Sequence, residues 1–297
     1  MKLSTVLLGL ASLVVSAPLA SRQSTFTDYL AVYFKGEFQN GEAIYLSVSN
    51  NNDPASWTEV NGGNLVLQSN VGTQGDLNVY ATGSYETENG SKGIVVWESS
   101  DLANWSSAAL RTISPDNAGM TWAPDAIWDP EQNQYLVFWT CNLKGDGWYI
   151  MKSYTSDFVT FSTAEKFLTG AGMDATIALD KSTNTFYRIS KNGPNELIEE
   201  ASASSLSGQW TVVVDSIGLG TLPAGEGPLI FQNNQDSSKW HLFIDDYTRG
   251  QGYKPFETTN IAQGNWVAST GYQLPSQFRH GYVVPITEAE RAAVTGG

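Results

Sequence analysis

The sequence contains one cysteine in 297 residues, which excludes an intramolecular disulfide. That residue, Cys141, ends the apolar run that starts at Gln134, and no histidine lies near it in the sequence. We therefore interpret it as a buried, inert thiol and not as a nucleophile. A chain of this length can bury a large core without covalent cross-links.

Basic residues are also scarce, since 16 Lys and Arg stand against 30 Asp and Glu and give a formal net charge of −14. Nucleic acid phosphates and anionic lipid surfaces repel such a chain, so neither nucleic acid nor membrane is an expected partner. Aromatic residues are abundant, with 10 Trp and 13 Tyr. Core packing explains most of them, and sugar-binding clefts also use aromatic faces.

Long apolar runs are missing except at the N-terminus. Lys2 is followed by a mostly apolar stretch from Val6 to Val15 and then by small residues, which is typical of a secretory signal. The stretch is too short to span a bilayer. We expect cleavage after Ala20, because cleavage after Ala17 would leave a proline at the new terminus. The predicted organisation is a signal peptide at 1–20 and a single domain at 21–297, secreted and monomeric.

Two sequons fit a secreted glycoprotein, because both would lie at the surface of a secretory product. They are Asn89-Gly-Ser91 and Asn104-Trp-Ser106.

Helical periodicity is weak everywhere except in the tail, where Thr287 is placed to cap a short helix that reaches Val294. Instead, a Ser/Thr/Asn-rich turn followed by an aromatic residue recurs at intervals of about fifty residues. The aromatic residues of this repeat are Trp57, Trp105, Phe161, Trp210 and Trp266. Five copies, each with short strand-like runs, predict an all-β, five-bladed β-propeller.

The two ends of the chain are expected to complete one blade together. The C-terminal stretch supplies one strand, at 279–286, and the N-terminal region supplies three, at 29–34, 43–49 and 57–60. Pairing of the N- and C-terminal strands would close the ring and leave no long exposed edge.

Four expected inner strands carry a polar residue at what we interpret as the corresponding place, namely Asp125, Asp174, Glu226 and His280. Inner strands line the axial channel of a propeller, so these side chains should converge. Apolar surroundings and like charges would then raise the pKa of one carboxyl group and make it a general acid. Two or three acids in one cleft, with indole faces nearby, is the arrangement that cleaves glycosidic bonds.

Each residue also has an ordinary structural interpretation. Asp125 could be a turn former, Asp174 could accept backbone amides, and His280 could be a core histidine. Glu226 lies between Gly225 and Gly227 and could be a solvated turn acid.

The motifs around these residues resemble those of glycoside hydrolase family 43. The motifs are Trp122-Ala-Pro-Asp125, Gly172-Met-Asp-Ala-Thr176, Gly225-Glu-Gly-Pro228 with Trp240-His-Leu-Phe243, and Arg279-His-Gly281. The resemblance implies a five-bladed, inverting enzyme that acts on arabinose- and xylose-containing polysaccharides.

By that resemblance Glu226 would be the general acid, and Asp174 would tune its pKa and position the substrate. Trp122, Asp125, Arg279 and His280 would belong to the substrate cleft. The chemistry requires no cofactor or metal, and a structural ion or a water is expected near His280 at the axis.

One departure concerns the general base, which the family places on the inner strand of the first blade in an Arg-Asp-Pro motif. No such motif occurs between Trp57 and Ile94. We interpret the region after Gly75 as lacking about twenty residues, through real loss or a missed exon. Asp76 could be recruited as the base, although its context is a polar turn.

Three functions therefore remain open. In the first, the chain would be a secreted glycosidase of the arabinofuranosidase or arabinanase kind, with xylosyl bonds as the next most expected substrate. Alternatively, it is a catalytically weak or inactive carbohydrate-binding propeller, or a structural propeller whose inner acids bind an ion. The expected partner in the first two cases is plant polysaccharide or oligosaccharide.

Overall fold

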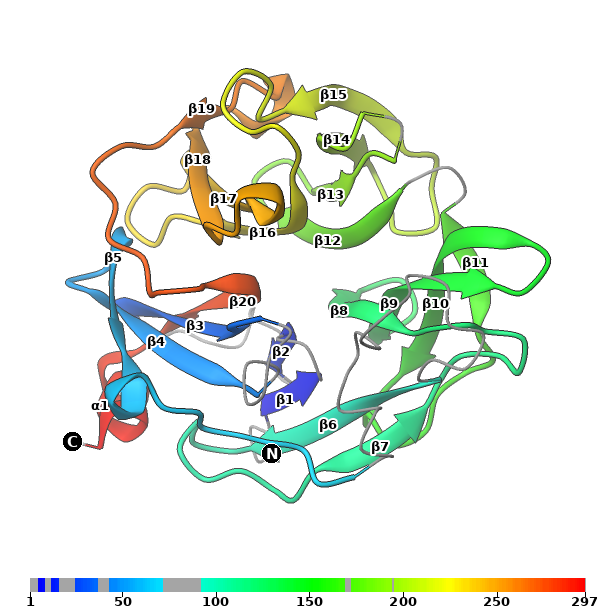
Figure 1. Ribbon diagram of the computed structural model, residues 1–297, viewed down its shortest axis with the longest axis horizontal. Coiled ribbons are helices and arrows are strands. Elements are labelled where there is room, and N and C mark those ends of the chain that lie inside the picture. Colours follow the sequence, from blue (N-terminus) through cyan, green and yellow to red (C-terminus); the bar gives the residue numbers. More distant parts are fainter. Residues whose placement is uncertain are drawn as a thin grey trace.

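Short antiparallel strands arranged around a centre make up almost all of the regular structure (Figure 1). The computed structural model describes residues 5–8, 12–15, 25–36, 43–71, 92–168, 172–193 and 195–296. These residues form an all-β, β-propeller fold built from five four-stranded sheets. The fold class expected from the turn-and-aromatic repeat is confirmed at this level.

Three of the sheets are continuous in sequence and run from the centre of the ring outwards. One contains β8 (Trp122–Asp129), β9 (Gln134–Leu143), β10 (Gly147–Thr155) and β11 (Glu165–Leu168). The next contains β12 (Met173–Asp180), β13 (Thr185–Lys191), β14 (Ile198–Ala203) and β15 (Thr211–Ile217). The third contains β16 (Glu226–Gln232), β17 (Trp240–Asp245), β18 (Tyr253–Thr258) and β19 (Val267–Ala268).

A fourth sheet joins the C-terminal strand to three N-terminal strands. It contains β20 (Arg279–Ile286), β3 (Asp28–Phe34), β4 (Tyr45–Asn50) and β5 (Asp53–Glu59). Strands β20 and β3 pair in an antiparallel register in which Ile286 faces Asp28 and Arg279 faces Phe34. Two segments far apart in the sequence therefore depend on each other for their hydrogen bonds.

The fifth sheet contains β2 (Ser12–Val15), β1 (Thr5–Leu8), β6 (Gly93–Ser99) and β7 (Ala109–Thr112). Its β1 strand pairs with both β2 and β6. Strands β1 and β2 fall inside the stretch expected to be a signal peptide. The sheet therefore draws two of its four strands from residues that secretion would remove.

The helices are few and short. They are α1 (Glu288–Thr295) and the 3-10 turns η2 (Val60–Gly63), η3 (Tyr247–Arg249) and η4 (Ile261–Gln263). Helix α1 begins with a capping box between Thr287 and Glu290, as the sequence predicts. No helix in the described ranges has the length and apolar character needed to cross a membrane.

Apolar side chains from facing sheets fill the spaces between them. For example, Phe138 and Ile150 pack with Ala175 and Ile177 between the β8–β11 and β12–β15 sheets. Cys141 is fully buried in a neighbouring cluster, and burial raises the pKa of its thiol to about 11. This agrees with its interpretation as an inert core residue.

Candidate active site

Four inner strands begin with a β-bulge. The antiparallel register shifts between Trp122 and Asp125 in β8, Met173 and Thr176 in β12, Glu226 and Leu229 in β16, and Arg279 and Tyr282 in β20. The second residue of each strand has a positive φ: 44° at Ala123, 53° at Asp174, 48° at Gly227 and 35° at His280. A bulge re-aims the side chains around it and often occurs beside an active site.

This shared bulge corrects one expectation. Asp125, Asp174, Glu226 and His280 do not occupy one equivalent position, because Glu226 is the first residue of its strand, Asp174 and His280 are second, and Asp125 is fourth. The four motifs look alike in the sequence, but their polar residues lie at different distances from the bulge. Only the hydrogen-bond register of the strands reveals these distances.

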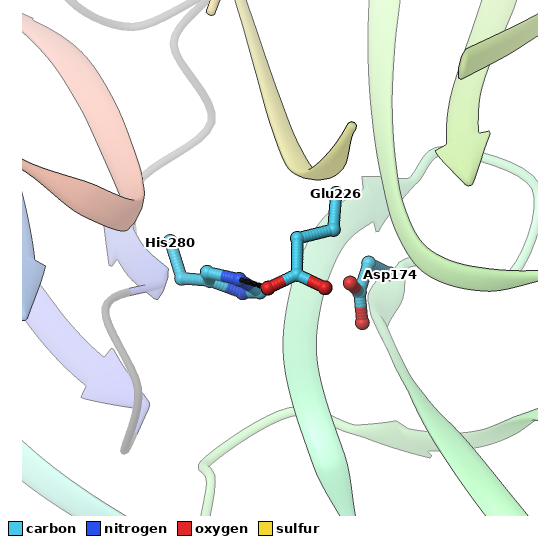
Figure 2. Close-up of side chains that lie close together, drawn as sticks. All are labelled: Asp174, Glu226 and His280. Atoms are coloured by element: carbon cyan, nitrogen blue, oxygen red, sulfur yellow. Dashed lines mark hydrogen bonds and ion pairs between the residues drawn. The ribbon is translucent and has the colours of Figure 1, made fainter. Parts of the chain in front are cut away.

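Asp174, Glu226 and His280 nevertheless converge from three strands (Figure 2). One potential ligand atom of each lies within 4.8 Å of the others. His280 Nε2 is 3.1 Å from Glu226 Oε1, and Asp174 lies on the other side of Glu226 in Figure 2. The Asp174 carboxylate accepts a hydrogen bond from the backbone amide of Gly227 at 3.2 Å.

Two further cations contact Glu226. Arg279 Nη2 donates to Glu226 Oε1 at 3.1 Å, and Lys191 Nζ lies 3.5 Å from Glu226 Oε2. Asp245 anchors the other side of this group, because its Oδ2 accepts from Arg279 Nε at 2.6 Å and lies 3.6 Å from His280 Nε2. Acids and bases therefore alternate in one buried network.

This network sets the charge of each acid. Burial pushes the pKa of Glu226 upwards, but His280, Lys191 and Arg279 together outweigh it and lower the pKa to about 2. Burial raises the pKa of Asp174, and the charge of Glu226 raises it further. Sequence reasoning expected the raised pKa on the general acid, assigned to Glu226; the pKa of Glu226 is instead lowered, and the raised pKa belongs to Asp174 beside it.

The surroundings of His280 shift its pKa in the direction that favours the charged imidazole. Burial opposes its protonation, but the hydrogen bond to Glu226 and the charges of Glu226, Asp174 and Asp245 raise its pKa above the ordinary value. His280 is therefore more than a neutral core histidine.

Asp125 lies beside this cluster, and Trp122 begins the same strand. The Asp125 carboxylate accepts from Thr176 Oγ1 at 2.7 Å and from the Ala126 amide at 2.6 Å. Asp125 also lines an axial pocket of about 30 Å³ together with Asp174 and His280. That volume holds a water or an ion.

Sequence reasoning missed Lys191, Asp245 and Tyr253. The Tyr253 hydroxyl joins two of the inner strands, because it donates to Gly227 O at 2.7 Å and accepts from the Gly281 amide at 2.6 Å. All three lie at the ends of second or third strands, next to the bulges, because Lys191 pairs with Met173 and Asp245 pairs with both Glu226 and Tyr253. The strand order could have pointed to them. In an antiparallel meander the second strand ends beside the start of the inner strand, so residues at that end lie next to the site.

The cluster has the composition of a metal site. Among the described residues, Asp174, Glu226 and His280 are the grouping that could hold an ion. Lys191 and Arg279 form ion pairs with Glu226, so two cations already compensate the charge of one of these ligands. The ion or water expected near His280 stays a prediction.

The general base is not supplied by the fifth sheet. Strands β1 and β2 contain no Asp or Glu, and Glu98 on β6 is exposed. Asp76 and the sequon at Asn89 lie outside the described residues.

The fold and the site together define a class of protein. It is a β-propeller whose inner strands bring two carboxyl groups, a histidine and an arginine together at its axis. Residues 24–292 match the family model described as "Probable glycosyl hydrolase domain", whose name relates it to glycoside hydrolase family 43. The chain belongs to this family, as the sequence motifs indicate.

Three similar proteins give the family context. An alpha-L-arabinofuranosidase of Bifidobacterium longum subsp. longum is 29% identical over 210 residues, which cover 56% of this chain and 20% of that protein. The chain therefore spans about a fifth of the length of that relative.

An endo-arabinase structure from Bacteroides thetaiotaomicron is similar with a TM-score of 0.51 and 16% identity, covering 64% of this chain and 76% of that one. An exo-beta-1,3-galactanase from Phanerochaete chrysosporium, solved with beta-1,3-galactotriose, has a TM-score of 0.48 and 14% identity, covering 90% of this chain and 54% of that one. At 16% identity, the similarity to the endo-arabinase shows a shared fold and nothing about activity.

Proposed function

We propose that this chain is a secreted five-bladed propeller, closed by β20 and β3, that hydrolyses arabinofuranosyl bonds of plant cell-wall polysaccharide with inversion. Xylosyl bonds are the neighbouring choice. The observation that carries the proposal is the meeting of Asp174, Glu226 and His280 at the axis of a glycosyl hydrolase family member. The arabinofuranosidase relative supports arabinose as the sugar.

In this proposal Glu226 is the general acid, which protonates the departing sugar oxygen, and Asp174 lies beside it to position the sugar. Glu226 has to take up a proton first, because the three surrounding cations keep it ionised in the free chain. His280 lies 3.1 Å from Glu226 Oε1 and its own pKa is raised by that carboxylate, so the proton that Glu226 takes up has to come from solvent and not from the imidazole.

An inverting reaction also needs a second carboxylate, about 6.5–9.5 Å from the acid, to activate a water. The inner strand β2 offers none. This observation favours a second candidate function, in which the propeller binds sugar with weak turnover or none.

Hydrolysis of aryl arabinofuranosides and aryl xylosides tests the proposal, with and without Glu226→Gln. Loss of the general acid should lower turnover by about 10²–10⁴-fold. Calorimetric binding of α-1,5-arabinotriose should survive the change. Binding without turnover in the unmutated chain would establish the second candidate, and no binding to any polysaccharide would overturn both.

Secretion is part of the same proposal. Expression with the full N-terminus in a secreting host should release a product that begins at Ser21. Glycan attached at the exposed Asn104 would support passage through the secretory route. Retention of the whole product inside the cell would contradict it.

A further inference from the structure

Trp148 is an exposed aromatic residue on β10. Its side chain is 39% exposed, and it is the one aromatic residue among the exposed large apolar side chains of the described residues. A single exposed apolar side chain is ordinary on a protein surface. What distinguishes Trp148 is its contact with the indole of Trp122, on the strand that leads into the axial pocket.

The position of Trp148 follows from the register of three strands. Trp148 on β10 pairs with Asn142 on β9, and two residues further along β9, Thr140 pairs with Trp122 on β8. Side chains alternate along a strand, so Trp122, Thr140 and Trp148 lie on one face of the sheet. That face is turned towards the next sheet, because Thr140 Oγ1 accepts a hydrogen bond from the amide of Asp174 on β12 at 2.9 Å.

The two indoles are in contact. Their ring centroids are 5.9 Å apart and their planes are tilted by 46°. Trp122 is only 9% exposed, so it supports Trp148 from below. Trp122 is also followed directly by Ala123 and Pro124, which line the axial pocket with Asp174 and His280.

The turn before Trp148 is uncrowded. It contains Gly145 and Gly147, and a Cβ added to either would meet nothing within 4 Å. Trp148 therefore presents part of its indole to solvent and rests on Trp122, whose strand continues into the axial pocket.

We propose that Trp148, supported by Trp122, is the platform for a second sugar unit of an oligosaccharide whose neighbouring unit lies over Asp174 and Glu226. The ligand class is a neutral oligosaccharide, which lays the C–H face of a ring on the indole while its hydroxyl groups stay in water. The proposal rests on the proposed function, since it takes the axial acids as the place of the first sugar unit.

Binding measurements in a background that cannot turn over test this platform. The chain with Glu226→Gln is titrated with arabinose and with α-1,5-arabinotriose, using calorimetry and quenching of tryptophan fluorescence. The trisaccharide should bind more tightly than the monosaccharide. Trp148→Ala should then weaken trisaccharide binding by about tenfold or more and leave arabinose binding unchanged.

Two control variants separate stacking from general surface effects. Trp148→Phe keeps an aromatic face and should retain most of the affinity. Leu110→Ala removes an apolar side chain of similar exposure, 44%, from the outer strand β7 and should change nothing. Thermal unfolding of each variant shows that loss of binding is not loss of fold.

The proposal is overturned if Trp148→Ala leaves trisaccharide affinity unchanged, or if the trisaccharide binds no more tightly than arabinose. These outcomes leave the axial acids and the proposed hydrolysis intact. If neither sugar binds, the proposed function itself fails, and this platform fails with it.

Discussion

At the scale of single residues, Glu226 and Glu200 have pKa values shifted in opposite directions by their surroundings. Both are glutamates on strands of the propeller. Cations surround Glu226 and outweigh its burial, whereas Glu200 on β14 is fully buried with one hydrogen bond, from Trp266 Nε1 at 2.7 Å. Its second oxygen has no partner among the described residues.

Glu226 should stabilise the fold at neutral pH. Its pKa falls from an ordinary 4.5 to about 2 on folding, so its contribution is complete above pH 4.5 and is lost as the pH falls towards 2. A shift of this size corresponds to at most about 3 kcal/mol. Glu226→Gln should therefore lower the free energy of unfolding at pH 7 and flatten its pH dependence between 4.5 and 2, as measured by urea unfolding.

The matched control is Glu98→Gln, which removes an exposed glutamate from β6. It should leave the acid limb of the stability curve as it is in the unmutated chain. If Glu226→Gln behaves like Glu98→Gln, the cation network does not hold Glu226 ionised.

Glu200 should have the opposite effect. Burial raises its pKa from 4.5 to about 7, against the hydrogen bond from Trp266. Stability from this group is complete below pH 4.5 and declines as the pH rises through 7, because the unfolded chain releases the proton first. Glu200→Gln should remove this decline and raise the free energy of unfolding at pH 8 by up to about 3 kcal/mol.

Chemical denaturation at several pH values between 4.5 and 8 measures this slope. The variant and the unmutated chain should diverge steadily over that range. Parallel curves would show that Glu200 titrates as an exposed glutamate does, with no penalty for burial.

The sequence could name the chemistry-bearing residues but not their charge. Glu226, Asp174, His280 and Arg279 follow from motif resemblance. The low pKa of Glu226 depends first on His280 and then on Lys191, which in the sequence resembles an ordinary surface lysine before an Asn-Gly turn. No local pattern reports a contact between residues on different sheets.

At the scale of elements, the bulges at the starts of the inner strands place the site. Each bulge needs a residue in the left-handed region, and three of the four carry a side chain there: Ala123, Asp174 and His280. Such strain is common where function requires a particular side-chain direction. The fourth position is Gly227, where the reason for glycine is steric.

Gly227→Ala should therefore disrupt the site. A Cβ there would lie 2.7 Å from the His280 ring, and φ is +48°. We expect a loss of at least about 2 kcal/mol in the free energy of unfolding, made up of left-handed strain and a displaced imidazole. The contact between His280 and Glu226 should weaken, which NMR titration of His280 would show as a lower pKa.

Gly250→Ala is the control, because its φ is +63° and an added Cβ would meet nothing within 4 Å. It should cost only the strain, about 1–2 kcal/mol, and leave the His280 titration unchanged. Equal effects of the two changes would mean that the crowding at Gly227 is unimportant.

Strand positions were predictable because apolar runs between turn residues are dense along this chain. The strand expected at 279–286 matches β20, and that expected at 29–34 matches β3 to within one residue. The register at the bulges was not predictable. The motifs Trp122-Ala-Pro-Asp and Met173-Asp-Ala-Thr do not reveal which residue falls outside the regular hydrogen bonding between strands.

At the scale of the whole molecule, the described sheets surround one axis, and the fifth sheet differs in where its strands come from. Its β6 and β7 strands belong to the body of the chain, whereas β1 and β2 belong to the expected signal peptide. An apolar run flanked by small residues fits both a signal peptide and a pair of short strands. The sequence therefore could not reveal the pairing of β1 with β6. This is also the sheet on which the family resemblance places the general base.

These observations fit together if the body of the chain lacks the two strands that β6 requires. A segment of about twenty residues is long enough for two short strands and a turn. The expected loss after Gly75 and the absence of a carboxyl group on β2 then have one cause. In the uncleaved chain the N-terminal stretch completes the sheet without restoring the base, and cleavage after Ala20 would remove β1 and β2 again.

The chain that begins at Ser21 should therefore be the less stable form. Without β1, β6 has an unpaired edge, and a two-stranded sheet is marginal in water. Purified 21–297 should unfold at least about 5 °C below 1–297 in calorimetry and should elute partly as aggregates. Equal unfolding temperatures would show that β1 and β2 contribute nothing to the fold, and that β6 tolerates an open edge.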